Sequence, residues 1–419
     1  MALKAKIRLN LSLLTWMVVV IAYLRTLNIT WDKETKLSLG YHIDALLNFT
    51  ELTSKYDYQT EEHDVVTEDG YILSIFHVRS KKCKETIKKT PVLLLHGFIE
   101  SADIFVDAGP KSGLAYLIPD ACFDLWVGNQ RGNYYGRRHT HLDPDKDSKF
   151  WQFSAEEMSY YDLPAMYDYI LDITGSDKLN YIGYSQGGGN FFIMCSERPE
   201  YCNKTNLMIA LAPAAIVTNT ESTALKLILQ GVSITRPVLE YFGIHELFYK
   251  GSVLQELLEF LCQYTNTFVT DVLCGTGGAF FDNYHPGSIS YETQKTLYGH
   301  FPAGSSLHTF ARYAQIDRSG KFQKYDYGDE GNLVKYGSRE PPEYNISAVT
   351  VPVVTIYGRN DKLTVVKDIK SVEERLPNLL DSVTVVDPLW THLDIVYSQY
   401  SGSVIFPTVK KYLDKYSAP

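Results

Sequence analysis

Short apolar runs alternate with helical stretches from about residue 60 onward, and this alternation constrains the fold of the chain more than any other feature. Buried strands that are separated by helices are typical of a doubly wound, mostly parallel sheet with helices on both faces. We therefore expect an α/β fold, in which Asp162 caps a helix that runs to about Ile173. The runs that we assign as strands are residues 92–95, 123–127, 179–182, 208–211, 353–357 and 383–386.

Residues 214–349 interrupt this alternation. They begin with helical apolar runs at 224–229 and 253–261 and continue with stretches rich in Gly, Tyr and Pro. Such a segment is typical of an insertion between two strands of one sheet. The 419 residues are therefore expected to form a split core, residues 28–213 and 350–419, and a mainly helical insertion at 214–349, rather than two independent domains.

The N-terminus carries three basic residues followed by an uncharged run, residues 11–24, that ends at Arg25. A basic segment before a short apolar run is typical of a secretory signal peptide, which we assign to residues 1–27. The run is shorter than the roughly 20 residues of a comfortable bilayer span. No clean small-x-small cleavage site follows it, so an uncleaved signal-anchor of a membrane protein is the alternative.

Sequons and cysteines also fit the secretory pathway. N-glycosylation sequons begin at Asn28, Asn48, Asn203 and Asn345. The six cysteines contain no C-x-x-C pair, which argues against a thiolate zinc site. An even number allows disulfides in a secreted chain, but six cysteines have 15 possible connectivities. Cys122 and Cys195 lie in apolar segments and could instead be buried free thiols.

Net charge argues against a nucleic-acid partner. The chain has 40 Lys and Arg residues against 49 Asp and Glu residues, a formal charge of −9. Nucleic-acid-binding proteins normally carry a basic surplus.

The strongest catalytic motif is Gly183-Tyr184-Ser185-Gln186-Gly187, which matches G-x-S-x-G between a strand and a helix. A nucleophilic serine needs this sharp turn to expose its hydroxyl, and Gly183 and Gly187 allow neighbouring backbone to approach closely. An incidental serine in a glycine-rich turn is the alternative. A dinucleotide-binding loop does not fit, because Ser185 stands where its second glycine is required.

A serine nucleophile needs a base and an orienting acid, which follow it in the order Asp or Glu, then His. Asp361 follows the strand at 353–357, and His392 lies in the loop after the strand at 383–386. Both placements fit, and we predict a triad of Ser185, Asp361 and His392. The alternative for Asp361 is a turn residue. The competing acids are Asp368, Asp387 and Asp394.

The oxyanion that forms in acyl transfer needs two backbone N–H donors. Gln186, directly after the nucleophile, is one candidate. Phe98, in the loop after the strand at 92–95, is the other, and Gly97 lets that loop approach. His96 precedes this loop and is assigned a structural role.

Together these residues resemble the acid lipase family, the gastric and lysosomal lipases of the α/β-hydrolase fold. The similarity covers about residues 40–415 and rests on several ordered blocks. These are the G-x-S-x-G turn at residues 183–187, called the nucleophile elbow, and residues 62–73 (EHDVVTEDGYIL), 94–98 (LLHGF), 128–139 (GNQRGNYYGRRH), 150–171 (FWQFSAEEMSYYDLPAMYDYIL), 301–306 (FPAGSS), 358–363 (GRNDKL) and 392–394 (HLD).

The resemblance implies an α/β-hydrolase core with a helical cap and lid at the insertion, a Ser185–Asp361–His392 triad and a disulfide between Cys262 and Cys274. It implies a lipid ester substrate taken at a lipid–water interface, transient contact with a membrane or lipid-droplet surface, and no metal or organic cofactor. It leaves open the lipid, the pH optimum, secretion against lysosomal delivery, and the oligomeric state. An esterase for small soluble esters and a non-catalytic lipid-binding protein are the alternative functions.

Four residues depart from the family pattern. Tyr184 stands where the family often has His, and Gly136 replaces a common Ser. Gly188 and Gly189 replace small polar residues after the elbow. None of these removes a triad or oxyanion group, but Tyr184 is expected to alter the acyl pocket or the pH profile.

Overall fold

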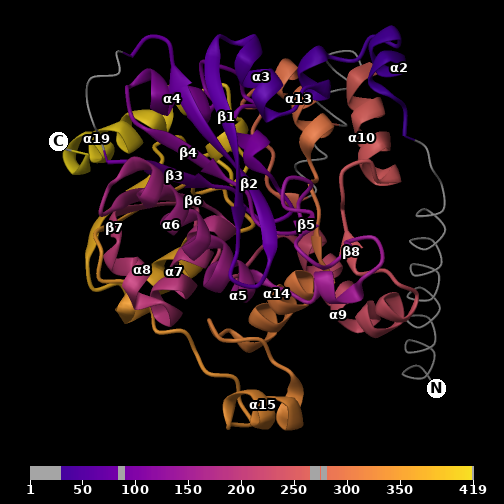
Figure 1. Ribbon diagram of the computed structural model, residues 1–419, viewed down its shortest axis with the longest axis vertical. Coiled ribbons are helices and arrows are strands. Elements are labelled where there is room, and N and C mark those ends of the chain that lie inside the picture. The colour runs from indigo at the N-terminus through magenta and orange to yellow at the C-terminus, as the bar shows by residue number, and fades with distance from the viewer. Residues whose placement is uncertain (1–29, 84–89, 265–273, 275–280, 418–419) are drawn as a thin grey trace.

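A computed structural model describes residues 30–83, 90–264, 274 and 281–417. The proposed signal segment and Asn28 lie outside these residues. The largest element is a twisted central sheet with helices on both faces (Figure 1). Its strands are β1 (Tyr58–Val66), β2 (Tyr71–Ser80), β3 (Val92–Leu95), β4 (Leu125–Gly128), β5 (Arg138–His139), β6 (Leu179–Tyr184), β7 (Thr205–Leu211), β10 (Val353–Tyr357) and β11 (Leu379–Thr384).

The strand order is β1-β2-β4-β3-β6-β7-β10-β11, with β5 paired to β2. The pairs from β4 to β11 are parallel, and β1, β2 and β5 pair in antiparallel fashion at one edge. The mostly parallel sheet that the sequence predicts is confirmed. All parallel strands end at the same edge, which is where loops of an open α/β sheet carry a site.

Each parallel strand buries both of its faces. In β3, Val92 and Leu94 join one apolar core, and Leu93 and Leu95 join the other. The first core lies under α4 (Leu114–Asp120) and α19 (Phe406–Tyr416), and the second lies under α6 (Leu163–Thr174) and α7 (Gln186–Glu197). This two-sided burial explains why the parallel strands appear as continuous apolar runs.

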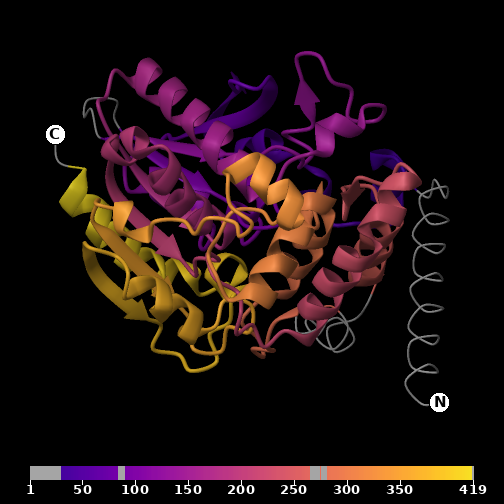
Figure 2. The same cartoon turned by 90° about the horizontal axis from the view of Figure 1, so that it is seen from below.

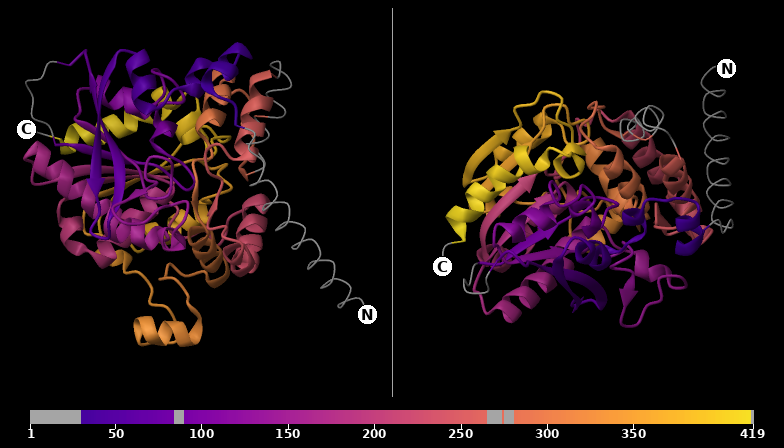
Figure 3. Two further views of the ribbon diagram at one scale, coloured as in Figure 1. Left: turned by 45° about the vertical axis from the view of Figure 1, so that its right-hand side comes forward. Right: turned by 90° about the horizontal axis from the view of Figure 1, so that it is seen from above.

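The chain between β7 and β10 leaves the sheet, although these two strands are neighbours within it. Its described elements are α9 (Thr223–Tyr241), β8 (Glu246–Leu247), α10 (Val253–Tyr264), α13 (Tyr291–His300), β9 (Ser305–Ser306), α14 (Leu307–Ser319) and α15 (Gly328–Tyr336). The first helices of this segment gather on one side of the sheet (Figure 2). Helix α15 projects away from the body (Figure 3). The remaining α-helices of the described ranges are α2 (Lys33–Ser38), α3 (Phe49–Lys55), α5 (Ala155–Glu157), α8 (Pro199–Asn203), α16 (Val366–Glu373), α17 (Asp394–Tyr397) and α18 (Ser401–Val404).

Two expected features are wrong. Asp162 does not cap α6 with its side chain, because its buried carboxylate binds Arg131 and the helical conformation already begins at α5, which Ser154 caps. The last strand lies at Leu379–Thr384, not at 383–386. It is an edge strand that pairs with β10 alone, so its side chains are half-exposed and its apolar pattern is weak.

All six cysteines form disulfides. The pairs are Cys83–Cys122, Cys195–Cys202 and Cys262–Cys274. The last pair is the one that the resemblance implies. The expectation of free thiols at Cys122 and Cys195 is wrong, because burial is compatible with a disulfide as much as with a thiol.

Candidate active site

Ser185 occupies the sharp turn between β6 and α7. Its backbone has φ 51° and ψ −117°, a conformation that L-residues rarely adopt. A Cβ atom at Gly187 would lie 2.6 Å from the carbonyl oxygen of Leu95, and one at Gly183 would lie 2.7 Å from the carbonyl of Gly187. Only glycine therefore allows this turn to sit so close to the end of β3, and the motif has the strained geometry of a nucleophile elbow.

Asp361 and His392 meet in the two loops that follow β10 and β11. His392 Nδ1 lies 2.7 Å from Asp361 Oδ2, and both side chains are buried. The Asp361 carboxylate also accepts the N–H groups of Leu363 and Thr364 and the Thr364 hydroxyl. With Nδ1 donating to a carboxylate, His392 keeps the lone pair on Nε2, the state that a general base requires.

Charges around His392 favour its protonated form. Burial opposes protonation, but the Asp361 carboxylate, with Asp282 and Glu100 further away, raises the pKa of His392 above its ordinary value. Asp282 is fully buried, and its carboxylate accepts the N–H of Lys362 at 2.9 Å and that of Leu393 at 3.1 Å. Burial and the nearby Asp361 charge raise the pKa of Asp282.

The three competing acids are engaged elsewhere. Asp368 accepts the backbone and side-chain N–H groups of Asn219. Asp394 binds His285 and the N–H of Thr391, and Asp387 lies on the other side of the same His285. Asp361 is the acid that contacts His392.

The loop after β3 lies against the elbow. A Cβ atom at Gly97 would be 2.9 Å from Ser185 Cβ. The N–H groups of Phe98 and Gln186 donate no hydrogen bond to any residue that the structure describes. Both remain available to a ligand, as an oxyanion hole requires.

His96 is a structural residue of this loop. Its Nδ1 contacts the Gly97 carbonyl at 2.9 Å, and its Nε2 accepts the N–H of Gln130 and the side-chain amide of Asn133. Burial lowers the pKa of His96 to about 4, which keeps the ring neutral.

Ser185 and His392 line one apolar cavity. The core contributes Phe98 and Leu393, and the segment between β7 and β10 contributes most of the wall. The lining residues of that segment are Ala214, Val217, Leu225, Ile228, Phe248, Phe281, Phe301, Phe310 and Tyr313. An apolar cavity with few polar groups suits a long hydrocarbon chain.

Glu100 is the unexpected polar group of this cavity. Its side chain is buried, its Oε2 accepts the N–H of Gly97 at 2.9 Å, and it lines the cavity with Ser185. Burial raises the pKa of Glu100 to about 8. Neither Glu100 nor Asp282 is a candidate from sequence, because no motif marks them and their significance arises from burial beside Ser185, Asp361 and His392.

The departures from the family pattern have structural counterparts. Tyr184 does not line the cavity: its ring packs 5.0 Å from the His392 ring, and its hydroxyl donates to the His392 carbonyl. Cβ atoms at Gly188 and Gly189 would lie 2.8 Å from Pro213 and 2.5 Å from Ala214. These glycines let α7 pack closely on the chain that leaves β7.

Comparison with known proteins agrees with this geometry. A family model described as a partial α/β-hydrolase lipase region matches residues 49–109, and one described as the α/β-hydrolase fold matches residues 90–233. The solved monoglyceride lipase of Saccharomyces cerevisiae, bound to a substrate analogue, has a TM-score of 0.53 at 15% identity. That alignment covers 86% of this chain and 97% of the yeast chain, and it supports the fold alone.

Curated relatives cover most of the chain. Lipase 1 of Drosophila melanogaster is 38% identical over 361 residues, which are 85% of this chain and 77% of the relative. Gastric triacylglycerol lipase of Mus musculus is 35% identical over 366 residues, 87% of this chain and 90% of the relative. Lipase member M of Homo sapiens is 31% identical over 386 residues, 91% of this chain and 88% of the relative. The chain therefore belongs to the lipase family of the α/β-hydrolase fold that includes gastric triacylglycerol lipase.

Proposed function

We propose that this protein is a serine lipase that hydrolyses carboxylic ester bonds of neutral lipids, triacylglycerols or sterol esters, through an acyl-enzyme. The observation that carries the proposal is the apolar cavity that Ser185 shares with His392, which is itself paired with Asp361 at 2.7 Å. The elbow conformation of Ser185 and the named lipase relatives support it.

The residues suit the two-step chemistry of acyl transfer. Nε2 of His392 takes the proton of Ser185 while Oγ attacks the ester carbonyl, and Asp361 stabilises the imidazolium that results. The N–H groups of Phe98 and Gln186 are proposed to bind the oxyanion, with roughly 3–4 kcal/mol from each donor. His392 then returns the proton to the leaving alcohol, and water repeats the sequence to release the fatty acid.

The residues 214–349 are proposed to act as a cap with a lid over this cavity. Leu225 and Ile228 of α9 line the cavity, whereas other apolar side chains of the same helix are exposed. The exposed set comprises Leu227, Ile234, Val238, Tyr241 and the following Phe242. Helix α9 therefore has apolar side chains both toward the cavity and toward solvent. We propose that the exposed side chains contact a lipid surface transiently, and that a single ester molecule passes from this surface into the cavity.

The proposed setting is the secretory pathway, with delivery to the extracellular space or to the lysosomal lumen. Three disulfides fit an oxidising compartment. The sequon residues Asn48, Asn203 and Asn345 are exposed and can accept glycans. Within the described ranges, no helix combines the length and apolar character that crossing a bilayer requires.

Labelling with a fluorophosphonate probe, followed by assays on emulsified lipid esters, tests the proposal. The wild-type protein should be labelled and Ser185→Ala should not. Turnover of emulsified triacylglycerol or sterol ester should fall to background in Ser185→Ala. Equal labelling of both proteins would remove the catalytic role of Ser185. Turnover of monomeric soluble esters alone would favour an esterase, and stoichiometric lipid binding without turnover would favour a binding protein.

A further inference from the structure

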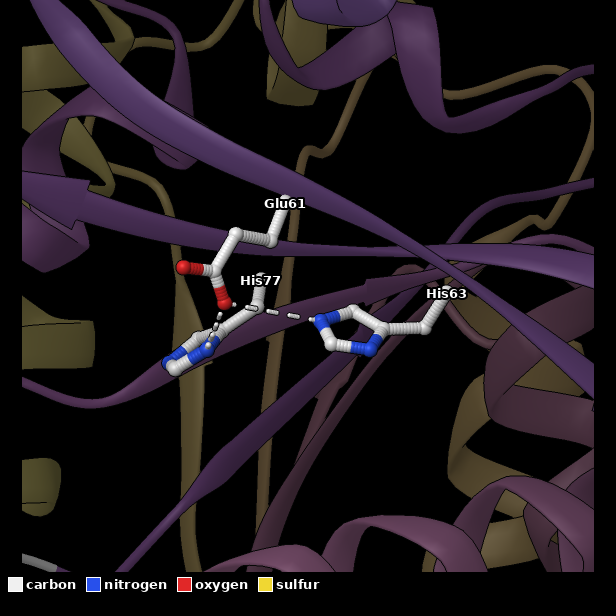
Figure 4. A group of neighbouring side chains, drawn as sticks. All are labelled: Glu61, His63 and His77. Carbon is white, nitrogen blue, oxygen red and sulfur yellow. Dashed lines mark ion pairs between the residues drawn. The ribbon is translucent and has the colours of Figure 1, made fainter.

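Three side chains on the edge hairpin point their nitrogen and oxygen atoms at one another, away from the cavity described above. Glu61 and His63 belong to β1, and His77 belongs to β2. Glu61 stands directly opposite His77 in the antiparallel register, and His63 follows two residues later on the same face. Figure 4 shows both imidazoles turned toward the Glu61 carboxylate.

The distances are close to those of a metal site. Glu61 Oε2 lies 3.8 Å from His63 Nε2 and 3.9 Å from His77 Nδ1, and the three ligand atoms lie within 4.8 Å of one another. In tetrahedral zinc coordination, neighbouring ligand atoms are roughly 3.4 Å apart. Zinc binding requires the Glu61 carboxylate to move about half an ångström closer to each imidazole, and its 55% exposed side chain can do so once it leaves Arg79. The two imidazole nitrogens, which lie within 4.8 Å of each other, have to approach as well.

Both imidazole rings are oriented by a hydrogen bond to the ring nitrogen that faces away from Glu61. His77 Nε2 binds Asp124 Oδ1 at 2.6 Å, and its ring stacks on Trp126 with a centroid distance of 4.2 Å and an interplanar angle of 5°. His63 Nδ1 binds the Tyr169 hydroxyl at 2.9 Å. Metal-binding histidines characteristically use the second nitrogen in this way, which fixes the ring and directs the first nitrogen at the metal.

The other ring nitrogen of His63, Nε2, has no hydrogen-bond partner among the described residues. His63 Nε2 is buried at the level of the atom and makes no hydrogen bond. A buried polar atom without a partner costs free energy unless a ligand satisfies it.

The positively charged guanidinium of Arg79 lies beside Glu61 and His77. Its Nη2 donates to Glu61 Oε2 at 2.7 Å and lies 3.3 Å from His77 Nδ1. The Arg79 side chain is 43% exposed and can leave for solvent without losing a buried contact. Arg79 therefore acts as a competitor that a metal ion has to displace.

We propose that Glu61, His63 and His77 form a binding site for a divalent transition-metal ion of the zinc class, in competition with Arg79. Two imidazoles and a carboxylate are typical zinc ligands, and water would complete the tetrahedron. The bound ion would link β1 to β2 at the edge of the sheet and would stabilise the fold by mass action. None of the three ligands lines the cavity, so ester hydrolysis is expected to proceed without the ion.

The test measures zinc binding by the full-length, metal-stripped protein, by titration calorimetry with ZnCl₂. Wild type should bind one ion, and His63→Gln and His77→Gln should each weaken binding at least tenfold. Asp124→Asn, which keeps all three ligands, should weaken it roughly 10- to 100-fold. Arg79→Gln should bind more tightly than wild type. His141→Gln, at an exposed position outside the cluster, is the matched control.

Cobalt(II) substitution provides a second readout, because a tetrahedral site gives an intense visible absorption band that His77→Gln should lose. Circular dichroism verifies that each variant is folded. The proposal is overturned if neither wild type nor Arg79→Gln takes up zinc. It is also overturned if His63→Gln and His77→Gln bind as tightly as the control.

Discussion

The carboxylate of Asp282 accepts the backbone N–H of Leu393, the residue directly after His392, at 3.1 Å. Its other oxygen accepts the N–H of Lys362, the residue directly after Asp361, at 2.9 Å. One buried side chain from the segment between β7 and β10 therefore holds the loops that carry the proposed base and its acid. The position of this segment is therefore tied to the geometry of the proposed triad.

Asp282→Asn is expected to move the acid limb of the pH–rate profile to lower pH. The Asp282 charge contributes to the raised pKa of His392, and a base with a raised pKa is protonated, and inactive, already at higher pH. Removing the negative charge lowers the His392 pKa and preserves the neutral base in more acidic solution. The measurement is kcat/KM against pH on a soluble ester.

The same variant should lose about 1–3 kcal/mol of stability, because an amide cannot accept from both N–H groups as the carboxylate does. Asp329→Asn, at an exposed position of α15, should change neither quantity. A loss of stability with an unmoved acid limb would show that Asp282 positions the loops without acting on His392 through its charge. The raised His392 pKa is expected to place the acid limb of the wild-type profile above the ordinary pKa of histidine, and the resemblance leaves the optimum itself open.

Glu100→Gln is expected to remove an alkaline decline in activity near pH 8. Burial raises the pKa of Glu100 to about 8, so this carboxyl is neutral below that pH and becomes negative above it. A negative charge in the cavity opposes both the oxyanion and the fatty acid product. Glutamine stays neutral and can still accept the N–H of Gly97. Identical alkaline limbs in wild type and variant would contradict this role.

The raised pKa of Glu100 also predicts how the stability difference between wild type and Glu100→Gln depends on pH. The folded protein holds the Glu100 proton more tightly than the unfolded chain does, so wild-type stability falls as pH rises from about 4.5 to about 8. The slope for one group is at most ~1.4 kcal/mol per pH unit. Glu100→Gln should therefore gain stability relative to wild type across that window and not below it. Denaturant unfolding at pH 4 and pH 8 measures the difference, with exposed Glu330→Gln of α15 as control.

The parallel strands are predictable from the sequence, because two-sided burial produces continuous apolar runs such as residues 92–95. The prediction for β11 begins four residues too late, because that edge strand has half-exposed side chains and the apolar residues at 383–386 lie partly beyond it. The prediction of Asp162 as a helix cap is wrong, because no local feature distinguishes a capping carboxylate from one that binds Arg131 across the fold.

The proposed triad could be named from order and spacing, because the elbow and the two later loops carry local motifs. Asp282 and Glu100 could not be found in this way. Asp282 is 79 residues away from Asp361 in sequence (361 − 282), and Glu100 resembles any polar residue of a loop. Their influence on His392 arises only when folding removes water from around all of them.

Gly187→Ala is expected to lower kcat/KM by about 10²–10³, the effect of losing one oxyanion donor. The added methyl group would meet the carbonyl oxygens of Leu95 at 2.6 Å and His96 at 2.8 Å, and would push the loop that carries Phe98 away from Ser185. Gly243→Ala is the control for backbone strain without a steric clash, because its Cβ meets no atom within 4 Å while its φ of 72° is unfavourable for alanine, whereas φ at Gly187 is not positive. Full activity in Gly187→Ala would show that the elbow does not depend on this close approach.

Exchanging Ile234 and Val238 of α9 for serine is expected to weaken action on emulsions while sparing soluble esters. These side chains are 62% and 46% exposed, so they contribute little to packing and are available to a lipid surface. Losing about 1 kcal/mol of apolar contact at each position predicts roughly tenfold or greater weakening of interfacial binding. Val334→Ser is a matched control, because Val334 is 91% exposed but lies on α15, away from the cavity. Vesicle or emulsion co-sedimentation, with kcat/KM on a monomeric ester measured in parallel, separates the two effects. An equal loss on both substrates would place these side chains in the packing of the cap instead of on a lipid-contact surface.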